Sequence, residues 1–593
     1  MREHRFRWLA MTVGLLLCDG ICGAAEQYRV TFEQDVKVAM RDGVVLRADI
    51  YRPRAEGKFP VLLQRTPYDK REFAIGLKGA ERGYVVIIQD VRGRYASEGE
   101  WYTFKNEAND GYDTVEWAAA LPYSNGKVGM FGGSYVGATQ MLAAILHPPH
   151  LAGICPIDTA SNYHANWTYQ GGAFEQWFSE SWTSGLAQDT LRRLAEKNTN
   201  AAGGMWELPL SGYPLFHLRR KQATALATLA PYFLDWLAHP NYDDYWKRIS
   251  IEDHYADITV PALHIAAWYD IFLGGTLRNY LGIKEPGGSE AARNGQQFMV
   301  SIGGHAGNER KVGDVDFGPN GAFSEDDVTL DWYDFLFKGA QNQFASGKPV
   351  KIFVLGTNQW REEEAWPLAR AKETKYFLHS TGAANSVRGN GTLSTTVPGK
   401  ETGDPYVYDP GKPAPTVGGP LCCDEDHWPP GPRDQRGVEA RDDVLVYSTP
   451  VLTQDMEVTG PVSVELYAKS SAVDTDFTAK LVDVWPDGFA QNLTEGILRA
   501  RYRESQENPT MITPGQVYKF TIDLWATSNV FKKGHTLRLE VSSSNFPRFD
   551  RNLNTGEQRL QGEGGRSFVP ATNVVLHDAE HPSVVVLPMV TVR

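Results

Sequence analysis

The stretch that decides the fold is VGMFGGSYVG, residues 128–137, and the helix-forming run Ala138–Leu146 follows it directly. Its first four residues predict a short buried strand, and the small residues after them allow a sharp turn. A serine in such a strand–turn–helix context matches a nucleophile elbow, in which the hydroxyl group is exposed. The match with Gly-x-Ser-x-Gly is incomplete, because Val136 takes the second glycine position and Gly137 follows it. Ser134 is therefore a candidate nucleophile.

Strands and helices alternate on both sides of this turn. Before it, Val61–Arg65 and Tyr84–Gln89 predict buried strands. After it, Pro261–Trp268 and Gln297–Ile302 predict two more strands, and Asp326–Phe337 has the apolar spacing of a helix. Short buried strands alternating with helices predict a parallel, doubly wound sheet, and thus the α/β fold class.

The pattern changes twice along the chain, and these changes predict the domains. Residues 163–247 are rich in Ala, Leu and Trp with helical periods, which predicts a helical insertion. From residue 349 to 593 many short alternating strands are separated by turn residues, as in an all-β sandwich or jelly roll. The α/β domain is then discontinuous and comprises residues 26–162 and 248–348.

Composition narrows the class of protein. A chain of 593 residues is long enough for several domains of roughly 100–200 residues each. The net charge of −13 provides no basic field, so we expect no nucleic-acid partner. Aromatic residues make up 11% of the chain, which predicts large buried faces or an aromatic-lined pocket. After the N-terminus no apolar stretch reaches the ~20 residues of a spanning helix, so we expect no stable membrane span.

The N-terminus resembles an export signal. Three arginines within the first seven residues precede the apolar run Trp8–Leu17, and Gly23-Ala24-Ala25 follows. This order predicts a signal peptide over residues 1–25 and a periplasmic or secreted protein. Lipid attachment at Cys18 is less favoured, because Leu17 is bulky where a small residue is expected.

The cysteines exclude a disulfide-dense scaffold and a zinc site. Without the signal peptide the chain keeps Cys155, Cys422 and Cys423, so at most one bridge and one free thiol can form. The adjacent Cys422 and Cys423 form either a vicinal disulfide or two small, half-buried apolar positions. No spacing of Cys and His suggests a metal ligand set, so we expect no metal.

Partners for the serine stand in the expected order. A serine hydroxyl needs a general base and a carboxylate that orients the base. Asp270 follows the strand Pro261–Trp268, and His305 follows the strand Gln297–Ile302. Since the carboxyl ends of parallel strands meet at one edge of a sheet, Ser134, Asp270 and His305 are predicted to form a catalytic triad.

These residues lie in segments that resemble a known family. The chain is similar, almost end to end, to the cocaine-esterase-like (CocE/NonD) serine hydrolases. That family is related to Xaa-Pro dipeptidyl-peptidases, glutaryl-cephalosporin acylases and α-amino acid ester hydrolases. The segments that carry the resemblance are RDG (41–43), TPYD (66–69), DVRG (90–93), GGSYVG (132–137), WYD (268–270), GH (304–305), AVDTDF (472–477) and SSSNFP (542–547).

The resemblance implies an α/β-hydrolase fold with an inserted helical cap and a C-terminal jelly roll. It also implies a role for each matching residue. Ser134 would be the nucleophile, His305 the general base and acid, and Asp270 the orienting carboxylate. The Tyr68 hydroxyl and the Tyr135 backbone N–H group would form the oxyanion hole. No organic cofactor is needed for this chemistry.

The resemblance further implies an aromatic acyl pocket. Trp167, Trp177 and Phe272 match its positions, as do the smaller Cys422 and Cys423. Ordinary core packing is the alternative for the two tryptophans. The α-amino acid ester hydrolases bind an ammonium group with a carboxylate cluster, and this chain lacks one at the matching positions, which are Asn166, Phe272 and Leu273.

We therefore expect a serine hydrolase that cleaves carboxylic esters through an acyl-enzyme, with a small-molecule ester or amide as substrate. The first alternative is an acylase or Xaa-Pro dipeptidyl-peptidase acting on amide bonds. Arg92, Arg94 and Lys70 keep a glutaryl-type acylase open as cations for an acyl carboxylate. A carbohydrate-binding or adhesion protein is an alternative of another class. The strands of the jelly roll permit a homodimer.

Overall fold

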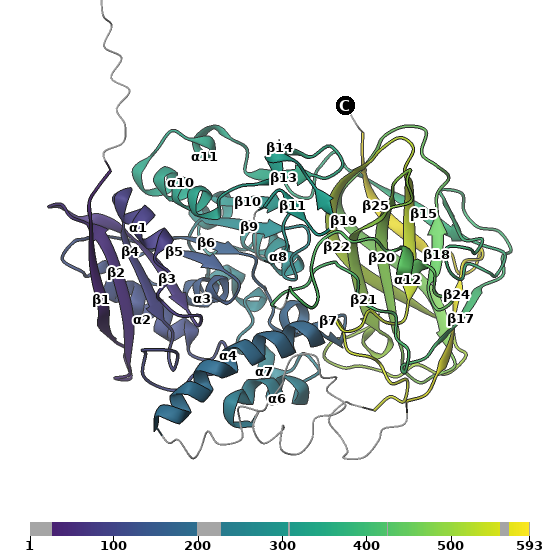
Figure 1. Ribbon diagram of the computed structural model, residues 1–593, viewed down its shortest axis with the longest axis horizontal. Coiled ribbons are helices and arrows are strands. Elements are labelled where there is room, and N and C mark those ends of the chain that lie inside the picture. The colour runs from purple at the N-terminus through teal and green to yellow at the C-terminus, as the bar shows by residue number, and fades with distance from the viewer. Residues whose placement is uncertain (1–26, 198–226, 306–308, 424, 558–567, 592–593) are drawn as a thin grey trace, which may run out of the picture.

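The computed structural model describes residues 27–197, 227–305, 309–423, 425–557 and 568–591. Two units lie side by side in it: an α/β unit formed by the N-terminal half and a β-rich unit at the C-terminus (Figure 1). The predicted signal peptide, residues 1–25, lies outside the described residues.

Ten strands form the sheet of the α/β unit in the order β1-β2-β4-β3-β5-β6-β9-β10-β13-β14. From β4 to β13 each strand runs parallel to its neighbour. β1, β2 and β14 pair antiparallel at the two edges. This arrangement confirms the predicted parallel sheet. Its strands are β1 (Val30–Ala39), β2 (Val45–Pro53), β3 (Phe59–Thr66), β4 (Val85–Asp90), β5 (Ser124–Gly133), β6 (Leu151–Ile157), β9 (Ala262–Ala267), β10 (Gln296–Ser301), β13 (Val350–Val354) and β14 (Gln359–Glu363).

Helices cover both faces of this sheet. The helices α2 (Glu107–Ala119) and α3 (Tyr135–Ala144) pack on one face, and α1 (Ala74–Glu81) and α10 (Glu325–Lys338) pack on the other. Alternate residues of the central strands enter two separate cores, which explains their unbroken apolar runs. Three more helices of this unit are α8 (Leu273–Lys284), α9 (Glu290–Asn294) and α11 (Gln343–Ser346).

The chain between β6 and β9 forms the predicted cap. The long helix α4 (Gln176–Lys197) contains the predicted helical run Thr190–Lys197. The predicted helix Gln222–Leu237 lies partly outside the described residues and ends within α6 (Pro231–Ala238). The cap also holds elements beyond its predicted helices, and the short ones are η1 (His164–Thr168), β7 (Tyr169–Gln170), β8 (Ala173–Phe174), α7 (Asp244–Lys247) and η3 (Glu252–Asp257).

The predicted domain boundary at residue 349 differs from the strand pairing. β13 pairs in parallel with β10, and β14 pairs antiparallel with β13, so residues 350–363 extend the N-terminal sheet. An alternating strand pattern reports which face is buried and not which sheet the strand joins. The β-rich unit therefore starts with β15 (Lys372–His379).

Within the residues that the structure describes, the C-terminal unit contains eleven paired strands. Ten follow the order β17-β24-β19-β25-β15-β16-β18-β23-β20-β21, and β22 pairs with β19. Together with the sheet and the cap, this β-rich domain confirms the predicted fold class. The elements after β15 are β16 (Thr392–Ser394), β17 (Asp404–Tyr408), α12 (Arg436–Glu439), β18 (Leu445–Ser448), β19 (Met456–Ser470), β20 (Asp476–Val484), β21 (Ala490–Arg499), β22 (Tyr518–Phe531), β23 (Thr536–Ser542), β24 (Ala571–Leu576) and β25 (Val584–Val590).

A buried arginine joins the C-terminal unit to the cap. Arg548 donates to Glu495 Oε1 at 2.6 Å and to Gln170 Oε1 in β7 at 2.9 Å. It also lies 3.5 Å from Glu175 Oε1, which directly precedes α4. Close by, the backbone N–H of Phe174 donates to Asp550 Oδ1 at 2.7 Å. These contacts hold α4 against the C-terminal unit.

Candidate active site

Ser134 lies at the turn between β5 and α3, with φ 60° and ψ −128°. Such a positive φ is unusual for a residue with a side chain and marks a sharp turn. The Ser134 backbone N–H donates to the Ile157 carbonyl oxygen of β6 at 2.9 Å, and the Thr159 hydroxyl donates to the Ser134 carbonyl oxygen at 2.8 Å. Neighbouring elements therefore fix the strained turn that presents the hydroxyl group.

Two glycines allow this turn for a steric reason. A Cβ atom on Gly132 would lie 2.5 Å from Val136 Cγ1, and one on Gly137 would lie 2.7 Å from Thr159 Cβ. Real Cβ atoms do not approach so closely without a shift of the chain. Val136 thus packs onto the first glycine, and the second small residue is needed at 137 because α3 meets Thr159 there. This explains the departure from Gly-x-Ser-x-Gly.

His305 and Asp270 form a hydrogen-bonded pair beyond the carboxyl ends of β10 and β9. His305 Nδ1 lies 2.6 Å from Asp270 Oδ2, and Asp270 Oδ1 accepts from the Phe272 backbone N–H at 2.7 Å. Since an ionised carboxylate only accepts hydrogen bonds, Nδ1 carries the proton and Nε2 is the basic nitrogen. Asp270 is fully buried, whereas His305 keeps 11% of its side chain exposed.

The Tyr68 hydroxyl lies 3.4 Å from Ser134 Oγ. Trp182 Nε1 of α4 donates to the Tyr68 hydroxyl oxygen at 3.0 Å, so its proton can point toward Ser134. The ring is partly exposed, but its hydroxyl group is enclosed, and this desolvation raises the pKa of Tyr68. Tyr68 therefore keeps its proton near neutral pH and remains a hydrogen-bond donor.

Tyr135 places its backbone and its side chain in different surroundings. Its backbone N–H lies near the Tyr68 hydroxyl, where it partly opposes the rise in the pKa of Tyr68. Its own hydroxyl donates to Glu107 Oε1 at 3.0 Å and accepts from the Phe104 backbone N–H at 2.8 Å in the core. The side chain is thus structural, and the N–H group is the one available at the site.

One pocket of about 360 Å³, here called the Ser134 pocket, brings these groups together. The wall includes one expected acyl-pocket residue, Cys423, together with the cap residue Trp182, which sequence reasoning missed. The residues that line the pocket are Tyr68, Gly133, Ser134, Ile157, Asp158, Trp182, His305, Glu325 and Cys423.

The other expected acyl-pocket residues, all of them within the described residues, are not among those that line this pocket. Trp167 stacks on Phe272 with ring centroids 4.3 Å apart, and Phe272 meets the His305 ring edge-on at 5.1 Å. The ring centroids of Trp177 and Trp428 lie 5.9 Å apart, and the Trp177 backbone N–H donates to the Pro547 carbonyl oxygen. Trp167 and Phe272 therefore support the His305 ring, and substrate contact by Trp167, Trp177 and Phe272 stays a prediction.

Cys422 and Cys423 form a vicinal disulfide, so the first of the two alternatives for this pair holds. Cys422 is buried in the core of the α/β unit, and Cys423 faces the Ser134 pocket. Cys155 is a buried free thiol. Substrate contact by Cys422 and Cys423 stays a prediction, but Cys423 is on the pocket wall.

Sequence reasoning also missed two acids of the Ser134 pocket. Asp158 follows β6 directly, and Glu325 is the first residue of α10. Burial raises the pKa of Asp158 well above its usual value, and the charges of Asp270 and Glu325 add to this effect. The available signal was the position of Asp158 at the end of a predicted strand, next to the serine turn.

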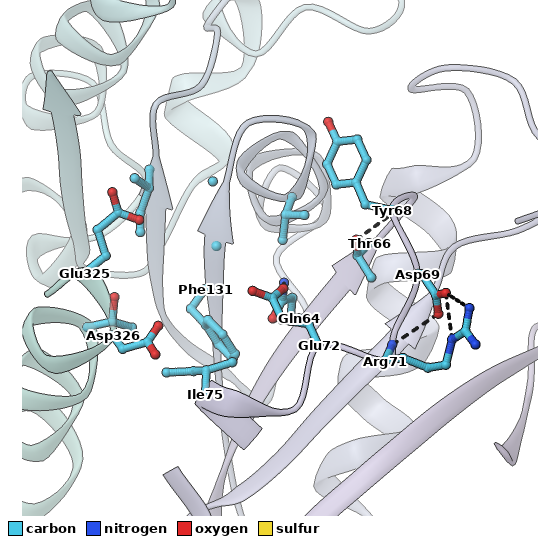
Figure 2. A pocket seen from close by; sticks show the side chains of 15 residues that line it. Gln64, Thr66, Tyr68, Asp69, Arg71, Glu72, Ile75, Phe131, Glu325 and Asp326 are labelled. Carbon is cyan, nitrogen blue, oxygen red and sulfur yellow. Dashed lines mark hydrogen bonds and ion pairs between the residues drawn. The ribbon is translucent and has the colours of Figure 1, made fainter. Parts of the chain in front are cut away.

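A larger, open cavity of about 690 Å³, here called the outer cavity, adjoins the Ser134 pocket. The two share Tyr68, Gly133, Ile157 and Glu325. Figure 2 shows Glu325 and Asp326 on one side of the outer cavity and Asp69 paired with Arg71 on the other. Four carboxylates and one guanidinium line it, so its surroundings are acidic.

Two expected absences concern metals and membranes. Within the described ranges, no group of three or more His, Cys, Asp or Glu side chains is arranged to hold a metal ion. The helices of these same ranges include none that is long and apolar enough to cross a membrane. The expectation that no metal or organic cofactor takes part stays a prediction.

The fold and the site define the class of protein: an α/β-hydrolase with a serine at the nucleophile elbow. The sequence matches the X-Pro dipeptidyl-peptidase (S15 family) over residues 42–307 and the X-Pro dipeptidyl-peptidase C-terminal non-catalytic domain over residues 342–586. The chain belongs to the cocaine-esterase-like serine hydrolases of this family, as the resemblance implied.

Similar proteins cover almost the whole chain. A cocaine esterase from Rhodococcus sp. (strain MB1 Bresler) is 40% identical over 582 residues, which are 94% of this chain and 98% of the esterase. The crystal structure of an aminopeptidase from the marine sediment archaeon Thaumarchaeota archaeon has a TM-score of 0.80 at 25% identity and covers 96% of this chain and 97% of its own. The structure of an α-amino acid ester hydrolase has a TM-score of 0.77 at 25% identity, and the match covers 97% of this chain and 100% of the hydrolase.

Proposed function

We propose that this protein hydrolyses carboxylic esters through an acyl-enzyme on Ser134. One observation carries the proposal: the Ser134 hydroxyl lies 3.4 Å from the Tyr68 hydroxyl in a pocket that is also lined by His305, whose Nδ1 lies 2.6 Å from Asp270 Oδ2. Membership of the cocaine-esterase-like serine hydrolases supports an ester as the substrate.

In the proposed reaction, His305 Nε2 takes the proton of the Ser134 hydroxyl as Oγ attacks the ester carbonyl carbon. The Tyr68 hydroxyl and the Tyr135 N–H stabilise the negative charge that develops on the carbonyl oxygen. His305 then gives its proton to the departing alcohol. Water, deprotonated by His305, attacks the acyl group and releases the acid and Ser134. Asp270 keeps the imidazole oriented and stabilises its protonated form.

Amide cleavage is the second candidate, because a similar structure is an aminopeptidase and the matching family is that of X-Pro dipeptidyl-peptidases. A glutaryl-type acylase is less favoured, because its three candidate cations already have partners. Arg92 pairs with Asp110, Arg94 Nε lies 3.7 Å from Asp189 Oδ2, and Lys70 Nζ lies 2.8 Å from Asp35 Oδ1. A free cation for an acyl carboxylate is therefore not among these three.

The test uses p-nitrophenyl esters of short and aromatic acids. Ser134→Ala removes the attacking oxygen, so we expect the turnover number to fall by at least about 10⁴-fold, as happens when other serine triads lose their serine. Circular dichroism and thermal unfolding serve as controls for folding. Hydrolysis by Ser134→Ala at the wild-type rate would rule out the proposed function, and a panel of matched amides would measure the second candidate.

Export is part of the proposal. The arginines and the apolar run of residues 1–25 have the order of a signal peptide, and they lie outside the described residues. A vicinal disulfide also suits an oxidising compartment. Fractionation of cells that produce the full chain, with mass spectrometry of the mature N-terminus, tests this point. A homodimer stays a prediction for sedimentation analysis.

A further inference from the structure

A loop from the C-terminal half brings the vicinal disulfide to the candidate active site. Two backbone hydrogen bonds between Gly419 and Gly431, of 2.8 Å and 2.9 Å, close the base of this loop. Near its second end Pro430 packs on Gly304, because a Cβ atom on that glycine would lie 3.3 Å from Pro430 Cγ. Gly304 directly precedes His305. The described part of the loop is therefore docked beside this histidine.

The two halves of the disulfide lie in different surroundings. Cys422 is only 3% exposed and belongs to the same apolar cluster as Trp167 and Phe272. Cys423 is exposed and lines the Ser134 pocket. One half of the disulfide is thus anchored in the core, and the other half forms a part of the pocket wall that a reagent can reach from solvent.

The backbone of Cys423 has an unusual conformation, with φ 75°. A residue with a side chain adopts a positive φ at a cost in energy, and it keeps this φ only where its surroundings hold it there. The disulfide supplies such a restraint, because it closes a small covalent ring between Cys423 and its anchored neighbour. Once the S–S bond is broken, the backbone at Cys423 can return to a negative φ and its side chain regains free rotation. The pocket wall then yields at this point.

Breaking the S–S bond requires a reductant, and a dithiol completes the reaction in two steps. One thiolate of the dithiol attacks Sγ of Cys423, in the exposed half, and forms a mixed disulfide with it. The electron pair of the broken bond passes to the Cys422 sulfur, which takes up a proton because an apolar core disfavours a thiolate. The second thiol of the reductant then displaces Cys423 from the mixed disulfide. Two electrons and two protons have passed to the cysteines, and the reductant leaves as a cyclic disulfide.

We propose that the Cys422–Cys423 disulfide is a site of thiol–disulfide exchange, and that its reduction by a dithiol loosens the wall of the Ser134 pocket for bulkier acyl groups. The inference rests on the proposed esterase function and adds a redox control of its substrate range. It concerns the acyl group, because this part of the ester stays bound to Ser134 Oγ until water releases it. The oxidised protein, which is the form that the structure shows, has the rigid wall and the narrower range.

The experiment compares the oxidised protein with protein reduced by dithiothreitol. Anaerobic desalting removes the dithiothreitol before the assay, because thiols cleave p-nitrophenyl esters on their own. The quantity measured is kcat/KM for p-nitrophenyl benzoate divided by kcat/KM for p-nitrophenyl acetate. Intrinsic differences in ester reactivity cancel when the ratio of the reduced protein is divided by that of the oxidised protein. Part of each sample is unfolded in N-ethylmaleimide, and peptide mass spectrometry shows which cysteines were reduced.

We expect reduction to raise the benzoate-to-acetate ratio by about tenfold, which is the low end for a change of fit by one methylene group in an apolar pocket. Reoxidation should restore the first value. An unchanged ratio in protein whose Cys422 and Cys423 are both reduced would overturn the proposal, and so would failure of dithiothreitol to reduce the pair in the folded protein. Both results leave the proposed function standing. If the oxidised protein hydrolyses neither ester, the proposed function itself fails.

Three variants separate the disulfide from other effects of the reductant. Cys422→Ala breaks the bond and keeps the Cys423 side chain on the wall, so it should show the raised ratio without dithiothreitol and no further response to it. Cys423→Ala breaks the same bond at the exposed half and serves if Cys422→Ala does not fold. Cys155→Ala is the matched control, because it removes the buried free thiol and keeps the disulfide, and it should respond as the wild type does.

The variants and the folding control also provide results that would contradict the proposal. A response to dithiothreitol in Cys422→Ala or Cys423→Ala as large as in the wild type would assign the redox effect to another part of the chain. Circular dichroism and thermal unfolding are recorded for the oxidised and reduced forms. A reduced wild-type protein that has lost its folded signal would contradict a change confined to the pocket wall.

Discussion

At the scale of the residue, the site depends on where hydroxyl protons and backbone N–H groups point. Ser134 is presented by a strained turn, and Tyr68 is held by Trp182 of the cap. Because Trp182 donates to the phenolic oxygen, the Tyr68 proton can point toward Ser134, as the proposed oxyanion hole requires. A donor that is placed before the reaction stabilises the oxyanion without reorganisation.

Tyr68→Phe removes this donor and keeps the ring. We expect kcat on p-nitrophenyl esters to fall by about 10²–10³-fold, as with the loss of one oxyanion-hole donor elsewhere, with little change in KM. Tyr232→Phe is the control, because it removes another buried hydroxyl that lies in the cap and outside the Ser134 pocket. Equal kcat values in Tyr68→Phe and the wild type would contradict the role of this hydroxyl.

Residue order pointed to Ser134, Asp270 and His305 as a candidate triad, but it did not point to the acids of the pocket. Ser134, Asp270 and His305 each follow a recognisable strand, and parallel strands bring their ends together. Asp158 also follows a strand, but an aspartate at such a place is common in turns. What distinguishes Asp158 is its Oδ1 atom, which has no hydrogen-bond partner among the described residues, and this depends on the packing of β6 against its neighbours.

At the scale of the element, the β5–turn–α3 unit is set by close contacts that only small residues permit. Gly137 in α3 faces Thr159, while Gly185 in the exposed face of α4 has nothing within 4 Å of its added Cβ. The same substitution should therefore have opposite effects at these two helical glycines.

Gly137→Ala should lower the free energy of unfolding by about 1–3 kcal/mol through overpacking. Gly185→Ala should raise it by about 0.5–1 kcal/mol, since alanine has the higher helix propensity. Urea titration followed by circular dichroism measures both values. If both variants shifted in the same direction, the steric account of the elbow would be wrong.

Element types were predictable where the apolar period was clear, as in β9, β10 and α10. The partners of strands were less predictable. β13 and β14 have the alternating pattern expected of the C-terminal unit, yet they extend the N-terminal sheet, because β10 offers β13 an open parallel edge. Strand pairing over such distances is a property of the assembled sheet and leaves no local mark in the sequence.

At the scale of the whole molecule, the Ser134 pocket needs all three parts of the chain. The α/β unit supplies Ser134, His305 and Tyr68, the cap supplies Trp182, and Cys423 comes from the C-terminal half. Arg548 holds the cap and the C-terminal unit together through Glu495 and Gln170.

Arg548→Met removes the cation and leaves two acids, Glu175 and Glu495, buried. We expect the free energy of unfolding to fall by about 3 kcal/mol, which is the low end for breaking a buried ion pair. The loss is at this end because Lys480 Nζ lies 3.4 Å from Glu495 Oε2 and still compensates part of its charge. Arg388→Met, at an exposed pair with Asp442, should change it by less than about 0.5 kcal/mol. Similar losses in the two variants, measured by urea unfolding, would contradict this role of Arg548.

The most direct test of the central claim is covalent labelling of the nucleophile. A fluorophosphonate probe reacts with an activated serine, and peptide mass spectrometry locates the adduct. We predict a single adduct on Ser134 Oγ in the wild-type protein and none in the folded Ser134→Ala variant. An adduct on another residue, or labelling of Ser134→Ala to the wild-type extent, would contradict an acyl-enzyme on Ser134.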